Sequence, residues 1–349
     1  MKATALALCV VLGSGEPSQV PSALGQLAAQ MRAGTWAELK TEGLNMKVFS
    51  DGSHHALEYT DEAVWDPVSR QLLFSGEGHG GPNRFVKYSE SSNQWTVLPL
   101  PDFADRKDWG FVHAYDHQAV DAASGTYYRT IYNKAIIHQY EPKTGVWSKL
   151  ADIPEEYGPR RHITKGFEYF PEMQGLVVFF SGSGVYFYHL PKKEWRVIAT
   201  KVGQYAYHEI ARYNPVHKVV VLGGGNDSTG YVSKELWKLD PAGKLTPLAS
   251  APIPFGINQT IFTVDPVSGK YLLLSRDKSF HEYDVVANSW SPAKGDKPPF
   301  FDLGGPGGPT FGCVAAPVSA HGVVLFVRYD GDKSKVYVYK HTEGTKQRR

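Results

Sequence analysis

The stretch YHEIARYNPVHKVVVLGGG, from Tyr207 to Gly225, predicts two antiparallel strands joined by a tight turn. We expect the first strand at Tyr207–Tyr213 and the second at Lys218–Leu222. The turn is Asn214–His217, because proline fixes φ and asparagine can bond its own backbone. The second strand is an unbroken aliphatic run, which is typical of a strand buried on both faces. The three glycines after it allow a sharp turn or a close backbone approach.

The same strand–turn–strand unit recurs about every 45 to 55 residues, a period typical of propeller blades. The turns of the other copies are WDPV at 65–68, VDAA at 120–123, YFPE at 169–172, VDPV at 264–267 and SAHG at 319–322. Each copy continues with a third strand, and most have a fourth that opens with tryptophan. These openings are Trp95, Trp147, Trp195 and Trp290, with Leu245 in the fourth copy. Four strands in each of six copies predict an all-β fold, a six-bladed β-propeller.

The sixth copy lacks its tryptophan strand, because the chain ends soon after Tyr339. The segment GTWAEL at 34–39 matches that missing strand and precedes the first copy. We expect this N-terminal strand to pair with the strand near Val336–Tyr339 and to close the ring. Closure removes the exposed sheet edges that an open array would carry. The sequence therefore predicts a single propeller domain over residues 34–341.

This pattern resembles Kelch and galactose-oxidase-like propellers over about residues 34 to 340. The resemblance rests on the second strand that ends in glycine, the tyrosine-rich third strand and the tryptophan-led fourth strand. The chain departs from the Kelch pattern in lacking a double glycine in most copies; the fourth copy has Gly223-Gly224. The resemblance implies the fold, and the function must be argued from a site.

Composition and the N-terminus bound the partners and the location. A net charge of +2 provides no electrostatic field for nucleic acid. Residues 1–20 contain the apolar run Ala3–Leu12, which is too short to span a membrane and resembles a secretory signal. Its removal would leave Cys313 as the remaining cysteine, with no internal disulfide. We expect a secreted or periplasmic monomer with no membrane attachment after removal of the signal peptide.

One face of the predicted disc collects most of the histidines. The turn between the first and second strands lies on one face, while the start of the first strand and the end of the second lie on the other. Seven of the 13 histidines fall on this second face: His54, His55, His79, His113, His117, His162 and His208. First strands line the central channel of a propeller, so we expect these side chains to converge in a polar ligand site.

The residue types on this face favour cleavage of a polysaccharide by β-elimination. That reaction needs a cation to offset a uronate carboxylate, a base for the adjacent proton, and an acid for the leaving oxygen. We assign the base to His117 or His208, the acid to Tyr207 or Tyr132, and the cation to Arg161 or Arg129. The predicted substrate-binding residues are His55, His79, His113, Arg129, His162, Asn226 and Asn258. The chain is similar in these residue types to exported propeller polysaccharide lyases, which implies an acidic polysaccharide or another glycan as the partner.

Two other catalytic chemistries stay open. Glycoside hydrolysis would need a carboxylate pair, and the face offers several acids without singling out two. These acids are Glu58, Glu77, Asp116, Glu209 and Asp227. A copper oxidase site like that of galactose oxidase needs a cysteine beside a tyrosine, and Cys313 shows no matching frame.

A divalent metal, zinc or calcium, is a further open expectation, and no cofactor is identified. His113 and His117 are predicted on an extended segment, which would place them about 13 Å apart. A shared zinc ion would therefore need histidines from other blades, such as His79 or His162. The alternative to catalysis is a propeller that binds a glycan or a protein without transforming it.

Overall fold

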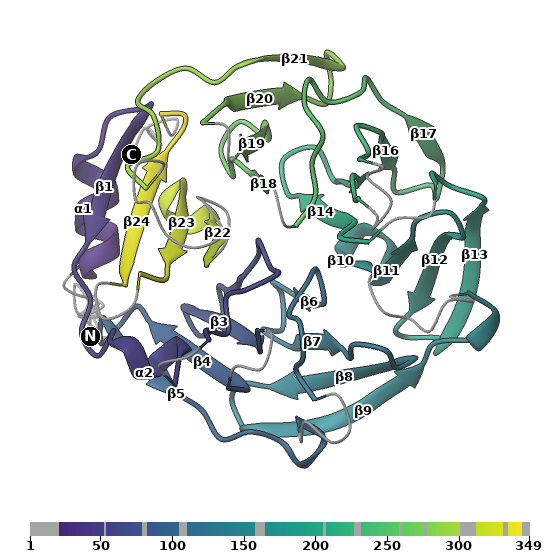
Figure 1. The fold of residues 1–349 in the computed structure, drawn as a ribbon, viewed down its shortest axis with the longest axis horizontal. Helices are drawn as coiled ribbons and strands as arrows, with labels where there is room; N and C mark the ends of the chain where they lie inside the picture. Colours follow the sequence, from purple (N-terminus) through teal and green to yellow (C-terminus); the bar gives the residue numbers. More distant parts are fainter. Residues whose placement is uncertain are drawn as a thin grey trace, which may run out of the picture.

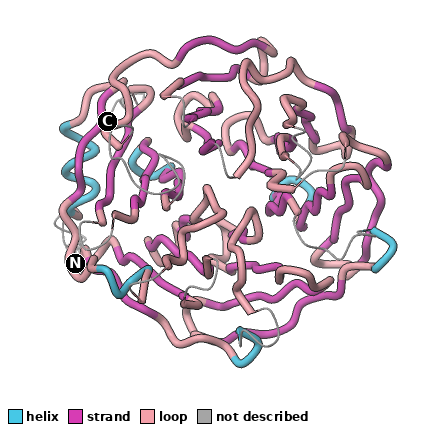
Figure 2. The backbone as a smooth tube through the Cα atoms, in the orientation of Figure 1, coloured by secondary structure: helices cyan, strands magenta, loops and turns pink. Residues whose placement is uncertain are grey.

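The computed structural model describes residues 21–51, 54–78, 82–104, 110–157, 165–204, 207–226, 232–257, 260–275, 278–300, 312–330 and 334–343. Within these residues, six four-stranded antiparallel sheets are arranged in a ring around a central axis (Figure 1). Figure 2 shows that strands are the main regular secondary structure and that the helices are short. The predicted all-β, six-bladed β-propeller is confirmed.

The blades follow one another along the chain, and strands run outward from the axis in sequence order in five of them. The first blade contains β2 (Val64–Asp66), β3 (Gln71–Gly76), β4 (Arg84–Ser89) and β5 (Gln94–Val97). The second contains β6 (Gln118–Val120), β7 (Tyr127–Thr130), β8 (Ile136–Glu141) and β9 (Val146–Asp152). The third contains β10 (Gly166–Phe170), β11 (Gly175–Phe180), β12 (Gly184–His189) and β13 (Glu194–Thr200). The fourth contains β14 (Ile210–Asn214), β15 (Val219–Gly223), β16 (Leu236–Leu239) and β17 (Leu245–Pro247), and the fifth contains β18 (Thr260–Val264), β19 (Tyr271–Ser275), β20 (Phe280–Asp284) and β21 (Ser289–Pro292).

The sixth blade joins the two ends of the chain, as predicted. It consists of β22 (Cys313–Val318), β23 (Val323–Arg328), β24 (Lys335–Lys340) and the N-terminal strand β1 (Thr35–Leu39). Strand β1 pairs antiparallel with β24, with Trp36 opposite Tyr339. The two rings stack with their centroids 4.4 Å apart. This pairing covers the outer edge of β24 and closes the ring.

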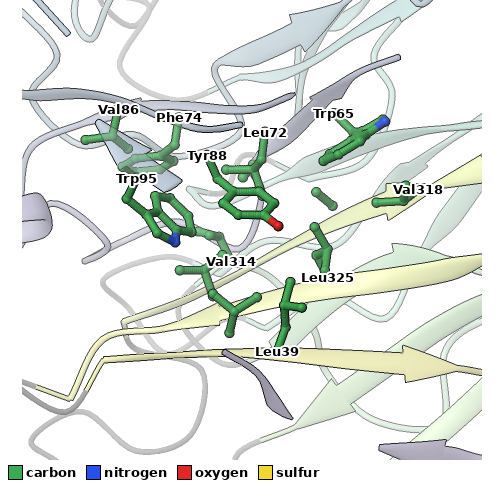
Figure 3. Packing of buried hydrophobic residues seen from close by; sticks show 14 of the residues in the cluster. Leu39, Trp65, Leu72, Phe74, Val86, Tyr88, Trp95, Val314, Val318 and Leu325 are labelled. Atoms are coloured by element: carbon green, nitrogen blue, oxygen red, sulfur yellow. The ribbon is translucent and has the colours of Figure 1, made fainter. Parts of the chain in front are cut away.

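The second strand is buried along its whole length in all six blades, which explains the apolar runs that the sequence has there. In β15, for example, every residue from Val219 to Gly223 is buried. Apolar clusters fill the spaces between neighbouring blades. Figure 3 shows the cluster between the sixth and first blades, where Val314 and Leu325 of one sheet face Leu72 and Tyr88 of the other.

Four of the recurring tryptophans tie their blade to the blade before it. The indole Nε1 of Trp195 donates to the carbonyl oxygen of Asp152 at 2.9 Å, and that of Trp290 donates to Ala249 at 3.2 Å. Trp36 donates to Asp296 at 3.0 Å, and Trp95 donates to the hydroxyl of Thr41 at 3.1 Å. The acceptor ends the outer strand of the preceding blade in the case of Trp195 and follows that strand in the other three. The tryptophan repeat therefore reflects a hydrogen bond between blades as well as apolar packing.

Short helices cover parts of the rim. Helix α1 (Ala23–Gln30) is capped by the Ser22 side chain, and its Leu24 and Ala28 pack into the cluster between the first and sixth blades. A second short helix, α2 (Met46–Phe49), precedes the first blade. The 3-10 turns are η1 (Asp102–Ala104), η3 (Glu155–Tyr157), η4 (Pro171–Met173) and η5 (Ser319–His321). In the part of the chain that the structure describes, no helix has the length and apolarity that a membrane crossing requires.

Candidate functional site

The segment before β6 is turned and not extended, which corrects the geometry expected for its histidines. Strand β6 begins at Gln118, and both His113 and Tyr115 have left-handed backbones, with φ of 47° and 41°. The main-chain N–H of His113 donates to the carbonyl of Glu77 at 2.9 Å, and that of Tyr115 donates to the carbonyl of Tyr59 at 2.8 Å. These bonds to the first blade hold the loop in a compact form. The extended spacing predicted between His113 and His117 is therefore wrong.

The loop places Tyr115 at the centre of a group of aromatic and imidazole rings. Its ring centroid lies 5.1 Å from that of His113 and 5.3 Å from that of His208. The centroid of Tyr132 is 6.0 Å away and that of Tyr59 is 6.4 Å away. We call Tyr59, His113, Tyr115, Tyr132, Tyr207 and His208 the ring cluster.

Three blades contribute to the ring cluster, so residues distant in sequence converge near the axis. Tyr59 precedes β2 of the first blade, and His208 precedes β14 of the fourth. Their rings are nearly parallel, with centroids 6.0 Å apart and an interplanar angle of 20°. Tyr207 is bridged to Asn226, which follows the second strand of the same blade. The convergence inferred from the strand order is therefore present for His113, Tyr132, Tyr207, His208 and Asn226.

His208 has a defined partner on one ring nitrogen. Its Nδ1 lies 2.5 Å from Oδ1 of Asn226. Because an amide oxygen can only accept, Nδ1 carries the proton in this arrangement, and Nε2 is then the basic nitrogen. The main chain is also held, since the N–H of Ile257 donates to the His208 carbonyl at 3.2 Å.

Four members of the ring cluster adopt left-handed backbone conformations. The φ values are 52° for Tyr59, 47° for His113, 41° for Tyr115 and 65° for His208. Side chains of this size rarely adopt such conformations, and each costs about 1–3 kcal/mol. Strained residues of this kind concentrate at binding and catalytic sites. The backbone therefore supports a functional role for the ring cluster.

A layer of basic side chains lies under the ring cluster. His117 touches Tyr115, with centroids 5.4 Å apart, and is fully buried. Burial lowers the pKa of His117 well below its usual value, and the neighbouring Lys165 and Arg129 lower it further. Burial also lowers the pKa of Lys165, to about 7, and that of Arg129, to about 10. His117 is therefore neutral at neutral pH.

Arg129 lies in the protein interior and is not exposed at the ring cluster. Its Nη1 donates to the carbonyl of Ala114 at 2.9 Å, and its side chain is fully buried. Lys165 donates to the carbonyl of Ile131 at 3.1 Å. A ligand bound at the ring cluster would thus be separated from both groups by the loop. Direct contact would fall to His113, His208 and the tyrosines.

His55 lies apart from the ring cluster, against the sixth blade. Its ring is 4.2 Å from that of Tyr329, and its Nε2 is 3.9 Å from Glu58 Oε1. Burial lowers the pKa of His55 to about 4, with Arg328 opposing its charge and Glu58 favouring it. The predicted site residues His79, Arg161, His162 and Asn258 lie outside the described residues.

Asp116, one of the acids considered for glycoside hydrolysis, is engaged in a buried charge cluster. Arg212 of β14 contacts Asp116 of the second blade and donates to Asp61 of the first blade at 2.6 Å. Its Nη1 is 3.3 Å from Glu62 Oε2, and its Nε donates to the carbonyl of Phe262 in the fifth blade at 2.9 Å. One guanidinium therefore links four blades beneath the ring cluster.

The carboxylates of this cluster outnumber the arginine. Burial raises the pKa of Asp116 to about 6, although Arg212 opposes the rise. Burial also raises the pKa of Glu168 in β10 to about 7, while the main-chain N–H of Tyr213, which donates to Oε2 at 2.8 Å, lowers it. The pKa of Arg212 is lowered by burial but raised more strongly by Asp116 and Asp61, so the guanidinium stays charged.

We predict that Glu168→Gln changes the pH dependence of stability. The folded-state pKa of about 7 exceeds the usual value near 4.3, so the folded state retains a proton that the unfolded state has lost. This contribution to the free energy of unfolding is full below about pH 4 and is lost as pH rises through about 7. We expect the free energy of unfolding of the variant, measured with urea and compared with that of the wild type, to be higher at pH 8 than at pH 5. Substitution of the exposed Glu194 by Gln should show no such trend. If the free energies of unfolding of Glu168→Gln and of the wild type changed equally between pH 5 and 8, the raised pKa assigned to Glu168 would be refuted.

A metal centre is not evident among the described residues, where no group of three His, Cys, Asp or Glu side chains is placed to hold an ion. The histidines that a zinc site would need from other blades lie outside these residues, so zinc or calcium binding stays a prediction. Cys313 is a buried free thiol in β22, and burial raises its pKa to about 12.

Tyr59 and Lys165 were not predicted as site residues from the sequence. Tyr59 follows the sequence HHALE, and nothing in its spacing marks it as a partner of His208. Lys165 lies just before β10, beside Arg129, and nothing in its spacing marks it as part of the site. Tyr115, the centre of the ring cluster, was also not among the predicted catalytic or substrate-binding residues.

No protein-family model and no curated protein matches the chain. Among solved structures, a Bacteroides thetaiotaomicron VPI-5482 structural genomics protein of unknown function is 11% identical with a TM-score of 0.55, covering 90% of this chain and 73% of that chain. A fungal alcohol oxidase of the AA5 family in complex with copper is 13% identical with a TM-score of 0.50, covering 79% of this chain and 60% of that chain. These structural similarities support the assignment of the chain to the β-propeller class. Sequence identities this low show a shared fold and nothing about function. The finer Kelch-like assignment stays a prediction.

Proposed function

We propose that the protein is an exported polysaccharide lyase that cleaves a uronic-acid-containing polysaccharide by β-elimination at the ring cluster. The observation that carries this proposal is the contact of 2.5 Å between His208 Nδ1 and Asn226 Oδ1. This contact makes Nε2 of His208 the basic nitrogen of the ring. Export follows from the signal-like residues 1–20.

His208 is the proposed base. In β-elimination the proton beside the uronate carboxylate passes to the base, the bond to the leaving glycosidic oxygen breaks, and a carbon–carbon double bond forms in the sugar ring. The Nε2 atom accepts this proton, while Asn226 holds the ring by its other nitrogen. His113 lies in the same ring cluster, 5.1 Å between centroids from Tyr132, and we assign it to substrate binding.

Tyrosine is the proposed acid for the leaving oxygen. Burial raises the pKa of Tyr132 and of Tyr59, so both phenols hold their protons at neutral pH and can donate. Both are half-buried and so retain exposed surface. We favour Tyr132 as the donor, because it belongs to the same blade as His113 and was expected in this role.

Positive charge below the rings suits an acidic substrate. Arg129 is fully buried and charged at neutral pH, whereas Lys165, equally buried and with a pKa lowered to about 7, is charged in part of the molecules; their fields act through protein and not through water, where screening would weaken them. They favour a bound carboxylate and the charge that develops as its neighbouring proton leaves. Since both are buried, Arg161 is the proposed group for direct contact with the carboxylate. His117 is fully buried as well, so we assign it to positioning Tyr115 and not to proton abstraction.

The runner-up is a propeller that binds a glycan without cleaving it. Four tyrosines in the ring cluster offer aromatic faces against which sugar rings can pack, and this requires no acid or base. The two functions differ in whether a bound polymer is shortened.

Incubation with a panel of uronic-acid polysaccharides tests the proposal. Polygalacturonate, alginate and hyaluronan are suitable members, and dextran, which has no carboxylate, is the control polymer. We expect ultraviolet absorbance from the new double bond to rise with at least one acidic polymer and not with dextran. Binding to an acidic polymer without any absorbance change would replace the lyase with the glycan-binding function. No binding and no absorbance change would reject both.

A further inference from the structure

A second hollow lies on the axis, at the face formed by the turns between first and second strands. Its volume is about 220 Å³, and first-strand residues of all six blades line it. That space would hold roughly seven water molecules or one small organic molecule. Arg212 and its carboxylates separate it from the ring cluster on the opposite face. We call it the turn-face cavity.

The turn-face cavity has an open rim and a buried, charged floor. Pro67, Ala122 and Pro215 at the rim are exposed, whereas Glu62 and Arg212 at the floor are buried. The walls between are mostly apolar and include three aromatic side chains: Trp65, Tyr169 and Tyr213. A ligand would therefore enter from the turn face, with a polar end pointing down and an apolar body against the walls.

The floor carries more carboxyl groups than guanidinium groups; burial raises the pKa of Glu62 well above its usual value, although Arg212 opposes the rise, and burial raises that of Glu168 to about 7. Glu62 and Glu168 both line the cavity, with Asp61 and Asp116 behind them on the same arginine. The Glu62 side chain is only 10% exposed, and its Oε2 accepts no hydrogen bond from the residues that the structure describes. Arg212 Nη1 lies 3.3 Å from that oxygen, outside hydrogen-bonding geometry. A buried carboxylate oxygen of this kind favours a donor from a ligand.

The composition of the cavity excludes several ligand classes. Anions would meet the carboxylate floor, and a polysaccharide chain exceeds the volume. A bare metal ion would need converging ligands, and no such group of His, Cys, Asp or Glu is found in the described parts of the chain. Aromatic walls attract cations through their ring faces, and apolar walls favour a hydrocarbon body.

We propose that the turn-face cavity binds a small primary ammonium ion with an apolar or aromatic body. The ammonium group pairs with the Glu62 carboxyl group at the floor, and the body packs against Trp65, Tyr169 and Tyr213. This site is independent of the proposed lyase activity, because the charge cluster lies between the two.

Titration of the full chain with benzylamine, compared with benzyl alcohol, tests the proposal. The two probes have nearly the same shape, and benzylamine is protonated at pH 7. We expect saturable heat by calorimetry and a rise in melting temperature with benzylamine, and at least tenfold weaker binding of the alcohol. Glu62→Gln should weaken benzylamine binding at least tenfold, while the exposed Glu194→Gln should not. His208→Asn, in the ring cluster, should leave it unchanged.

A second variant keeps the test decisive if Glu62→Gln does not fold. Ala122 is exposed at the rim, so Ala122→Phe should narrow the mouth without disturbing the buried charges. It should abolish benzylamine binding while the melting temperature of the unliganded protein stays near the wild-type value. Equal binding of amine and alcohol, no binding of either, or full binding to the Ala122→Phe variant would overturn the proposal.

Discussion

Arg212→Met is expected to lower the free energy of unfolding at pH 7 by about 3–5 kcal/mol, since removing one partner leaves buried charge uncompensated. The guanidinium is 6% exposed, and Asp61 and Asp116, which it contacts, are 1% and 0% exposed. Without it the carboxylates must either stay charged in the interior or take up protons, and both cost free energy at neutral pH. The measurement is urea unfolding followed by tryptophan fluorescence.

The exposed Arg196 offers a matched control for this substitution. It stacks over Phe187 at the surface, 5.3 Å from the ring centroid, and forms no ion pair among the residues described. Arg196→Met should therefore cost no more than about 1 kcal/mol. Adding Asp61→Asn and Asp116→Asn to Arg212→Met should recover much of the loss, because the stranded charges are then gone. A loss below about 1 kcal/mol for Arg212→Met alone would show that the cluster does not hold the blades together.

The fold could be predicted from sequence because its signals are local and repeated. Each turn carries its own chemistry: Oδ1 of Asn214, for instance, accepts from the main-chain N–H groups of Val216 and His217 at 3.1 Å. Five of the six outer strands contain a tryptophan, and the absence of such a strand after the sixth copy indicated that the strand with Trp36 completes the ring. Because the pattern repeats in six copies, a wrong assignment of one strand would not have changed the predicted fold.

The site was less predictable because it depends on backbone conformations and partners that sequence spacing does not encode. The left-handed φ of Tyr115 turns the loop away from an extended path and brings its ring to His208. Arg212 lies within the predicted strand Tyr207–Tyr213, and nothing in its spacing marks it as the centre of a charge cluster. Its carboxylate partners Asp116 and Asp61 are 96 and 151 residues away in sequence, so only the closed ring brings them together.

The charge cluster divides the axis into two ends with opposite character. On one face Arg129 and Lys165 lie under a ring cluster, and on the other the carboxylates of Glu62 and Glu168 form the floor of the turn-face cavity. An acidic polymer is favoured at the first end and disfavoured at the second. The two proposed ligands, a uronate polymer and a small ammonium ion, therefore do not compete for one site.

His208→Asn is expected to lower kcat of the proposed lyase by about 10²- to 10⁴-fold, the contribution typical of a positioned general base. Asparagine is the suitable replacement because it tolerates the left-handed conformation that His208 adopts, with φ of 65°, better than other side chains do. The local backbone should persist, and KM should change little, since the aromatic walls of the ring cluster stay in place. The rate is read from the absorbance of the unsaturated product on the most active polymer of the panel.

His189→Asn is the matched control, because His189 ends the third strand β12 at the turn to β13, away from the ring cluster. Its activity should equal that of the wild type. Tyr132→Phe separates the acid from the base: it keeps the ring and removes the proton, so it should lower kcat while polymer affinity is retained. If His208→Asn kept wild-type activity while Tyr132→Phe lost it, the base would have to be reassigned to His113, whose ring centroid lies 5.1 Å from those of Tyr115 and Tyr132. Full activity in both variants would remove the ring cluster as the catalytic centre, whatever polymer is cleaved.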